Sequence, residues 1–255
     1  GWAWCGMLAL AVALCACGYR DAPVPQGRLV PPTSGVRAHF REQSLLVSWD
    51  VPSDDLTRRY GPVMSYTIVL REIPLACAVC PPVDTRTLNL ASDSRNLIGE
   101  GGRLYLPLTP PEPVNWLVSV RTRYLSVENA DSDPVLAQGQ GTLPQATLRG
   151  ERVPAGRSAR LFWAARRERQ VQVLTAGGGM EVRDYFFRAN LYRRVPPAAW
   201  PIAPLNPEPL TTLQETVPLP PAAGSQEQVE YAMRWVDEFD NEGPLSAPVR
   251  ISLSR

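Results

Sequence analysis

Short apolar segments, broken by proline and turn residues, run through most of this 255-residue chain. The 27 prolines are dispersed between these segments, and beyond residue 34 the 3.6-residue periodicity of an amphipathic helix is nearly absent. Proline lacks a backbone donor and fits neither the interior of a helix nor a central strand, so it keeps each regular element short. Short segments rich in β-branched and aromatic residues between turn residues are typical of strands. The sequence therefore predicts an all-β fold.

The first β-rich unit contains three such segments. Residues 44–49 end in Trp49, and residues 65–72 form a longer segment. The third segment, 115–121, places Trp116 and every second residue after it on one face, because side chains alternate across a strand. Aromatic residues on facing strands can fill the space between two sheets that pack about 10 Å apart.

The same order of segments recurs in the second half of the chain. Residues 159–163 end in Trp163, residues 185–192 form the longer segment, and residues 231–235 begin with Tyr231. These repeated segments resemble two tandem fibronectin type III domains. The resemblance implies two immunoglobulin-like β-sandwiches, domain 1 at residues 35–143 and domain 2 at residues 144–255. It also implies that Tyr231 is a tyrosine corner, whose hydroxyl bonds to the backbone near the preceding bend.

The N-terminal segment predicts where the protein is located. An apolar run that starts at Met7 ends in Leu14, Cys15, Ala16 and Cys17, which resembles the lipobox of a bacterial lipoprotein signal peptide. The resemblance implies that residues 1–16 are a cleaved signal and that Cys17 carries the lipid. Cys17 fits better than Cys15, because cleavage before Cys15 would place the bulky Leu14 at the position that requires a small residue.

Two other interpretations of this segment stay open, a short membrane-spanning anchor and an ordinary signal peptide, since no Lys or Arg precedes Arg20. The glycine after Cys17 implies sorting to the outer membrane, so we expect a lipid-anchored protein of the cell envelope. Residues 17–34 then form a lipidated, proline-rich tether. Its residues 19–34 would span about 50 Å in an extended conformation.

Composition and charge limit the expected partners. All 26 basic residues are arginine, and 25 acidic residues leave a net charge of only +1, which gives no general attraction to nucleic acid. By the resemblance, the expected role is non-catalytic binding, spacing or assembly, with no cofactor and with another envelope protein or a glycan as partner. The linker near residues 138–144 is short and contains glycine and proline, which allows either a fixed elbow or a hinge.

Cys77 and Cys80 are the one closely spaced cysteine pair outside the leader. In an oxidising compartment such a pair is expected to form a structural disulfide. Thiol-redox exchange is the alternative function, but it requires a lowered thiol pKa, and the βαβ pattern that usually accompanies such a motif is absent. Zinc is not expected, because a structural site usually takes four ligands and the mature chain offers these two cysteines and His39.

No catalytic residues are predicted. His39 is the sole histidine and alternates with its neighbours as a strand residue would, and no Gly-x-Ser-x-Gly motif accompanies it. Five arginines between Arg157 and Arg169 could bind an anion, but such a run usually faces water. Trp200 lies in the long proline-rich stretch 196–224 and is the candidate for partner binding, because Trp is a frequent anchor of interfaces. Alternatively, Trp200 covers the edge of a sheet.

Overall fold

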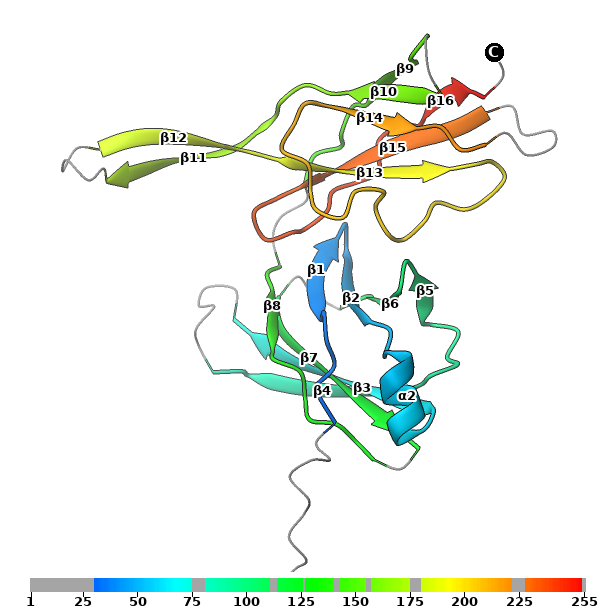
Figure 1. The fold of residues 1–255 in the computed structure, drawn as a ribbon. Coiled ribbons are helices and arrows are strands. Elements are labelled where there is room, and N and C mark those ends of the chain that lie inside the picture. The colour runs from blue at the N-terminus through cyan, green and yellow to red at the C-terminus, as the bar shows by residue number, and fades with distance from the viewer. Residues whose placement is uncertain are drawn as a thin grey trace, which may run out of the picture.

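The computed structural model describes residues 30–74, 81–110, 114–125, 127–139, 143–154, 157–174, 180–221 and 228–253. These residues form two β-sandwiches, one after the other along the chain, and a two-stranded ribbon that projects from the second (Figure 1). The all-β prediction is confirmed, with one short helix among the described residues.

The first sandwich consists of two four-stranded sheets with the orders β1-β2-β6-β5 and β4-β3-β7-β8, in which all neighbours are antiparallel. The strands are β1 (Arg37–Arg41), β2 (Ser44–Asp50), β3 (Val63–Ile73), β4 (Asp84–Ala91), β5 (Ile98–Glu100), β6 (Arg103–Leu108), β7 (Asn115–Tyr124) and β8 (Val135–Ala137).

Alternation along the strands builds the core of this sandwich. Trp116, Val118 and Val120 on β7 are at most 2% exposed, which confirms the face predicted from their spacing. Trp49 on β2 is fully buried, and its ring lies 5.1 Å from the ring of Tyr66 on β3. The tilt of 56° between the two rings is an arrangement that aromatic pairs favour.

A short helix, α2 (Asp54–Tyr60), connects the two sheets between β2 and β3. Its N-cap is Ser53, whose hydroxyl accepts a hydrogen bond from the backbone N–H of Leu56. The helix ends at Gly61, whose φ of 91° is readily available only to glycine. The capping residues Ser53 and Gly61 are present in the sequence, but a helix of seven residues is too short to show a clear helical periodicity.

The chain is already packed against the first sandwich before residue 35. Val30 is buried beside Tyr60 and Tyr124, and the side chain of Asn129 donates to the carbonyl of Pro31 at 3.3 Å. The last residues that the sequence assigns to the tether therefore lie against the domain.

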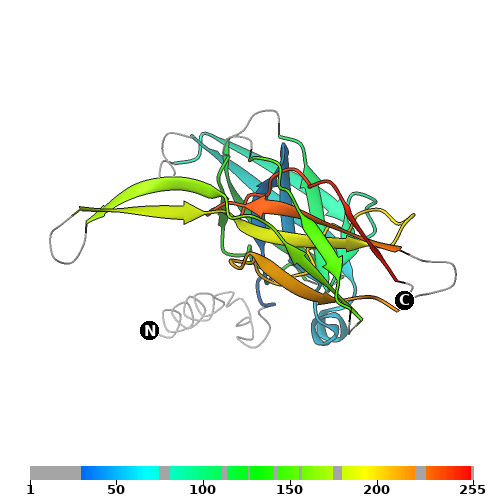
Figure 2. The same ribbon diagram turned by 90° about the horizontal axis from the view of Figure 1, so that it is seen from above.

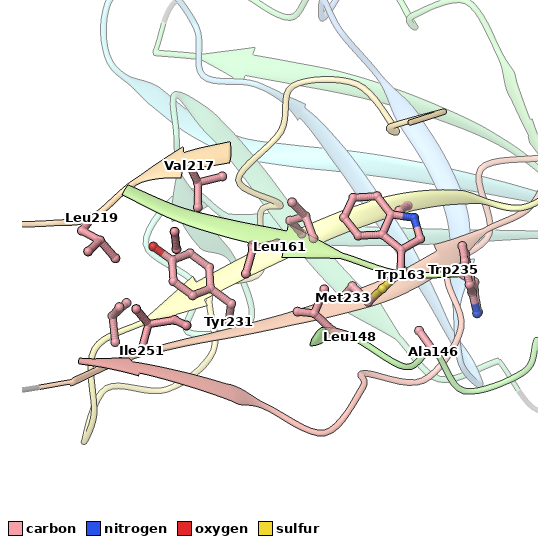
Figure 3. Close-up of a cluster of buried hydrophobic side chains, with 14 residues drawn as sticks. Ala146, Leu148, Leu161, Trp163, Val217, Leu219, Tyr231, Met233, Trp235 and Ile251 are labelled. Carbon is pink, nitrogen blue, oxygen red and sulfur yellow. The ribbon is translucent and has the colours of Figure 1, made fainter. Parts of the chain in front are cut away.

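The second sandwich has two three-stranded sheets with the orders β14-β10-β9 and β13-β15-β16. The strands are β9 (Arg149–Arg152), β10 (Ser158–Phe162), β13 (Arg188–Arg194), β14 (Gln214–Pro218), β15 (Gln228–Val236) and β16 (Val249–Ser252). Figure 3 shows their inward side chains, with Trp163, Leu161 and Met233 between the sheets. The ring of Tyr231 belongs to this core. Its hydroxyl is buried and has no hydrogen-bond partner among the described residues, so the bond predicted for a tyrosine corner is not seen there. The preceding bend, residues 222–227, lies outside the described residues.

The ribbon consists of β11 (Arg167–Leu174) and β12 (Met180–Phe186), which pair antiparallel between β10 and β13. It extends sideways from the second sandwich in both views (Figures 1 and 2). The segment 185–192, predicted as one strand, is therefore divided. Tyr185 and Phe186 end β12, and β13 starts at Arg188, because the chain crosses from the ribbon into the sheet at Phe187.

Candidate functional site

The turn between β1 and β2 contacts the second sandwich through backbone hydrogen bonds. The N–H of Glu242 donates to the carbonyl of Phe40 at 2.7 Å, and the N–H of Glu42 donates to the carbonyl of Glu242 at 2.9 Å. These bonds form a parallel bridge between Arg41 and Glu242. Glu42 has a φ of 56°, a conformation uncommon outside glycine, which turns the chain back at the contact. The sandwiches are thus joined by more than their linker.

An ion pair lies at the centre of this contact. Arg41 Nε and Glu242 Oε2 are 2.5 Å apart, and their side chains are only 14% and 2% exposed. The other carboxylate oxygen of Glu242 accepts from the hydroxyl of Tyr192 at 2.7 Å and from the amide of Asn190 at 2.5 Å. A buried charge is tolerated when it is paired and hydrogen-bonded, and Glu242 meets both conditions.

The charge state of the pair follows from these contacts. Burial alone would raise the pKa of Glu242, since it removes water from the carboxylate. The charge of Arg41 and the hydrogen bonds from Asn190 and Tyr192 outweigh burial and hold the pKa below its ordinary value of 4.5. Burial, and then the neighbouring carboxylate, raise the pKa of Tyr192 well above its ordinary value of 10.0. At neutral pH, Glu242 is ionised and Tyr192 is a neutral donor.

Contacts on both sides of the ion pair set the orientation of the domains. Asn241 Oδ1 accepts from the N–H of Phe40 at 2.8 Å, and its Nδ2 donates to the carbonyl of Gln138 at 3.1 Å. Elsewhere Glu100 Oε2 accepts from the N–H of Ile202 at 2.8 Å. Contacts at several separate places resist rotation about any single one. Of the two possibilities that the sequence allowed for the linker, this geometry favours the fixed elbow.

A cleft of about 660 Å³, lined by both polar and apolar side chains, lies beside this junction. Its lining includes Arg37, His39 and Arg103 from the first sandwich and Asn206 and Glu208 from the second. His39 Nε2 is buried and, among the described residues, has no hydrogen-bond partner. Burial lowers the pKa of His39, so the ring is neutral at pH 7. No described hydroxyl or thiol is bonded to Nε2 as an activated nucleophile would be.

Trp200 lies in the segment 195–213, which connects β13 to β14 and runs along the edge of β13. The N–H of Leu210 donates to the carbonyl of Ala189 at 2.8 Å, and Asn206 Oδ1 accepts from the N–H of Leu191 at 2.7 Å. In the first sandwich, the corresponding edge is covered by β4. The segment thus replaces a strand and satisfies the donors of an edge that would otherwise be open.

The indole of Trp200 is partly buried beneath an arginine. The guanidinium of Arg194 lies 4.6 Å from the centre of the ring, and Arg194 Nε donates to Glu230 at 2.7 Å. Arg250 also donates to Glu230, at 2.9 Å. The hydrogen bonds from Arg250 and Arg194 lower the pKa of Glu230, which keeps this carboxylate charged. Trp200 is therefore held by a cation–π contact with Arg194, which is itself held by Glu230.

The arginines between Arg157 and Arg169 are exposed, and three of them face acidic side chains. Arg160 lies 3.5 Å from Glu151, and Arg167 lies 3.6 Å from Asp184. Arg169 pairs with Glu238. With most of its charge matched, this run is a solvated surface rather than a cluster aimed at an anion.

The cysteines with predicted roles, Cys17, Cys77 and Cys80, lie outside the described residues. Their lipidation and their disulfide stay predictions. Within the described part of the chain, no group of three or more His, Cys, Asp and Glu side chains is placed to hold a metal ion. None of the helices in that part is long and apolar enough to cross a membrane.

The strand orders of the two sandwiches decide the fold. In immunoglobulin-type lettering, the first sandwich has an A-B-E sheet (β1, β2 and β6), to which β5 adds a fourth strand, and a C′-C-F-G sheet (β4, β3, β7 and β8). The second sandwich has an A-B-E sheet (β9, β10 and β14) and a C-F-G sheet (β13, β15 and β16). The chain has the fold of two tandem fibronectin type III domains. No protein-family model and no curated protein matches the sequence.

The solved structures that follow are similar to this chain only at low sequence identity and low TM-score. The FN1-FN3 domains of chicken CNTN1 are 12% identical, with 88% of this chain and 68% of that chain covered and a TM-score of 0.32. A two-domain fibronectin type III segment of chicken tenascin is 10% identical, with 88% and 100% covered and a TM-score of 0.30. A myokine structure is 19% identical over 43% of this chain and 98% of that chain, with a TM-score of 0.29. At these scores we draw no functional conclusion from the likeness.

Sequence reasoning missed the residues of the junction. Neither Arg41 nor Glu242 belongs to a motif that would indicate a contact between the domains. A second repeat could have been found, since Ser-x-Pro occurs at residues 132–134 and again at 246–248. In the first sandwich Ser132 Oγ accepts from the N–H of Val120 at 3.0 Å, and in the second Ser246 Oγ accepts from the N–H of Met233 at 3.1 Å. This pairing supports the alignment of the two copies.

Proposed function

We propose that the chain is a lipid-anchored protein of the bacterial outer membrane that holds two sandwiches as one rigid unit for a non-catalytic binding, spacing or assembly role. The lipid is attached at Cys17, and the residues between Cys17 and Val30 form the free tether. This proposal combines the lipobox-like sequence with the geometry of the junction. The lipid and the location rest on the sequence alone.

The observation that carries the proposal is the buried contact of Arg41 with Glu242. A flexible tandem of domains needs only a linker, whereas this chain joins its domains by a buried ion pair and by two backbone hydrogen bonds among the described residues. Interfaces between neighbouring domains of one chain are commonly small and permit relative motion. A rigid pair of domains presents a surface at a fixed distance and orientation from its anchor, which suits a spacer or an assembly platform.

We propose the segment around Trp200 as a contact with the partner, another envelope protein or a glycan. The indole is partly exposed, and Arg194 fixes it in place, so little conformational entropy is lost when a partner covers it. Cys77 and Cys80 are proposed to form a structural disulfide in the connection after β3. The thiol-redox role is the alternative for these two cysteines.

The mass of the mature protein tests the anchor. The full-length gene is expressed in a Gram-negative host, and intact masses are measured from the membrane fraction for the natural chain, Cys17→Ser and Cys15→Ser. We expect a species that begins at an acylated Cys17 in the natural chain. Cys17→Ser should abolish it, and Cys15→Ser should still be acylated, because its lipobox cysteine is intact. An unacylated natural chain, or acylation that survives in Cys17→Ser, would contradict the proposal.

A further inference from the structure

The ribbon of β11 and β12 is exposed on both faces. Every residue of β12 from Glu181 to Phe186 is exposed, and Val182 and Phe186 are 58% and 53% exposed. Both views show the ribbon projecting away from the two sandwiches (Figures 1 and 2). A two-stranded hairpin that packs against nothing is only marginally stable in water. The ribbon therefore gains stability from any surface that covers it.

The two edges of the ribbon differ. The base of β11 is held by its own domain, because Arg169 pairs with Glu238 beyond β15 and lies over the ring of Tyr185, 5.0 Å from its centre. The outer edge of β12 pairs with no strand of the described residues. An edge of this kind presents a row of backbone donors and acceptors that can accept another strand.

Charges on an edge strand usually discourage such pairing, but those of β12 have a symmetric arrangement. Glu181 and Arg183 flank Val182, and all three are exposed. When two copies of β12 lie antiparallel with Val182 opposite Val182, Glu181 of each copy lies opposite Arg183 of the other. Opposed residues of antiparallel strands have side chains on one face, so both ion pairs can form and the two valines meet. Moving the centre to Arg183 would oppose like charges.

We propose that β12 is a self-association edge, which pairs with β12 of a second copy of this chain about a two-fold axis at Val182. The two ribbons then form one antiparallel four-stranded sheet. The contact is isologous, since the same residues meet from both sides, and it closes as a dimer. This inference goes beyond the proposed function and is independent of the lipid anchor.

Charge exchange between copies tests the register. Full-length chains with two different affinity tags are co-expressed and solubilised in detergent, and capture of one tag by the other is quantified. We expect natural chains to capture one another. Glu181→Arg in both copies, or Arg183→Glu in both, places like charges opposite each other twice and should reduce capture at least about fivefold. Pairing the Glu181→Arg chain with the Arg183→Glu chain should restore capture, as should the double variant with itself.

A matched site controls for overall charge. Glu151 on β9 and Arg160 on β10 are an exposed pair of the same domain, so Glu151→Arg and Arg160→Glu change the net charge equally at a different sheet. These variants should leave capture unchanged in every combination. Thermal unfolding of each variant confirms folding. The proposal is overturned if natural chains do not capture one another, if the ribbon variants capture as well as the natural chain, or if the mixed pair is not restored.

Discussion

At the scale of single residues, Glu242 has the largest consequences. Its carboxylate is 2% exposed and is satisfied by Arg41, Tyr192 and Asn190, which come from both sandwiches. Removing two charges from water costs several kcal/mol, and attraction at close range offsets this cost only when both partners are present. The pair therefore contributes little net stability as a whole, while the loss of one member is expensive.

We expect Glu242→Gln to lower the free energy of unfolding by about 3 kcal/mol, because it leaves Arg41 buried without a counter-charge. Urea unfolding followed by tryptophan fluorescence measures this loss. Asp55→Asn is the control, because Asp55 pairs with Arg58 at the surface, where both side chains are more than three-quarters exposed. It should change stability by less than about 0.5 kcal/mol. Equal effects of the two variants would show that the junction is not desolvated.

The same residue predicts a pH dependence. The pKa of Glu242 is lower in the folded chain than its ordinary 4.5, so its ionisation stabilises the folded state fully above pH 4.5. This contribution is lost as the pH falls through the lowered pKa. Glu242→Gln has no such group and should lose less stability than the natural chain between pH 5 and acidic pH. Urea unfolding of both proteins at several pH values gives the free energy of unfolding as a function of pH. An identical pH dependence for the two proteins would contradict the prediction.

At the scale of elements, the segment 195–213 covers the edge of β13 as a neighbouring strand would, although it is not itself a strand. The side chain of Asn206 accepts from the backbone of Leu191 at 2.7 Å and donates to Asn190 at 2.9 Å and to the carbonyl of Glu208 at 2.7 Å. One buried amide thus links the edge of β13 to the covering segment. A buried donor that loses its acceptor retains its cost of desolvation, so this amide is hard to replace.

We expect Asn206→Ala to destabilise the protein by about 2–3 kcal/mol, since the N–H of Leu191 is left buried without an acceptor. Asn89→Ala is the matched control, because Asn89 accepts an exposed hydrogen bond from Thr67 at 2.8 Å in the first sandwich. Its effect should stay below about 0.5 kcal/mol. Chemical unfolding of both variants measures the difference. A small effect at Asn206 would mean that water reaches the edge of β13.

At the scale of the whole molecule, the junction sets the relation between the two domains. Among the described residues, three pairs of charged residues bridge the sandwiches: the buried Arg41 with Glu242, Arg234 with Glu42 at 2.6 Å, and the exposed Arg37 with Glu208 at 3.3 Å. The exposed pair is screened by water and salt, so it constrains little. We attribute the fixed relation to the buried pair and the backbone bonds around it.

Small-angle scattering of the full chain in detergent can separate these contributions. The natural chain should fit a single arrangement of the two sandwiches. Arg41→Ala should broaden the distribution of interatomic distances, because it removes the ion pair and the hydrogen bond from Arg41 to the carbonyl of Ile202 at 2.9 Å. Arg37→Ala should leave the distribution unchanged. A broad distribution for the natural chain would show that the junction opens in solution.

The sequence predicts those parts of the molecule that depend on local alternation. Trp49, Trp116 and Trp163 indicated the two cores, and all three are buried. Alternation identified the inward face of β7, whereas β2 is buried at five consecutive positions from Leu45 to Trp49. The ribbon was not predicted, because nothing in the sequence showed that the strands on either side of residues 175–179 would extend away from the sheets. The junction was missed because Arg41 and Glu242 are 201 residues apart. Which surfaces of two folded domains meet is not encoded in either segment alone.

The hydrogen bonds between the β1–β2 turn and Glu242 also have a mechanical consequence. The peptide linker and this contact attach the second sandwich to the first in parallel. A pull between the N-terminal end of the first sandwich and the C-terminal end of the second would therefore load both attachments together. The two sandwiches would therefore transmit the force as one rigid body, and they would move independently only after the β1–β2 turn has separated from Glu242.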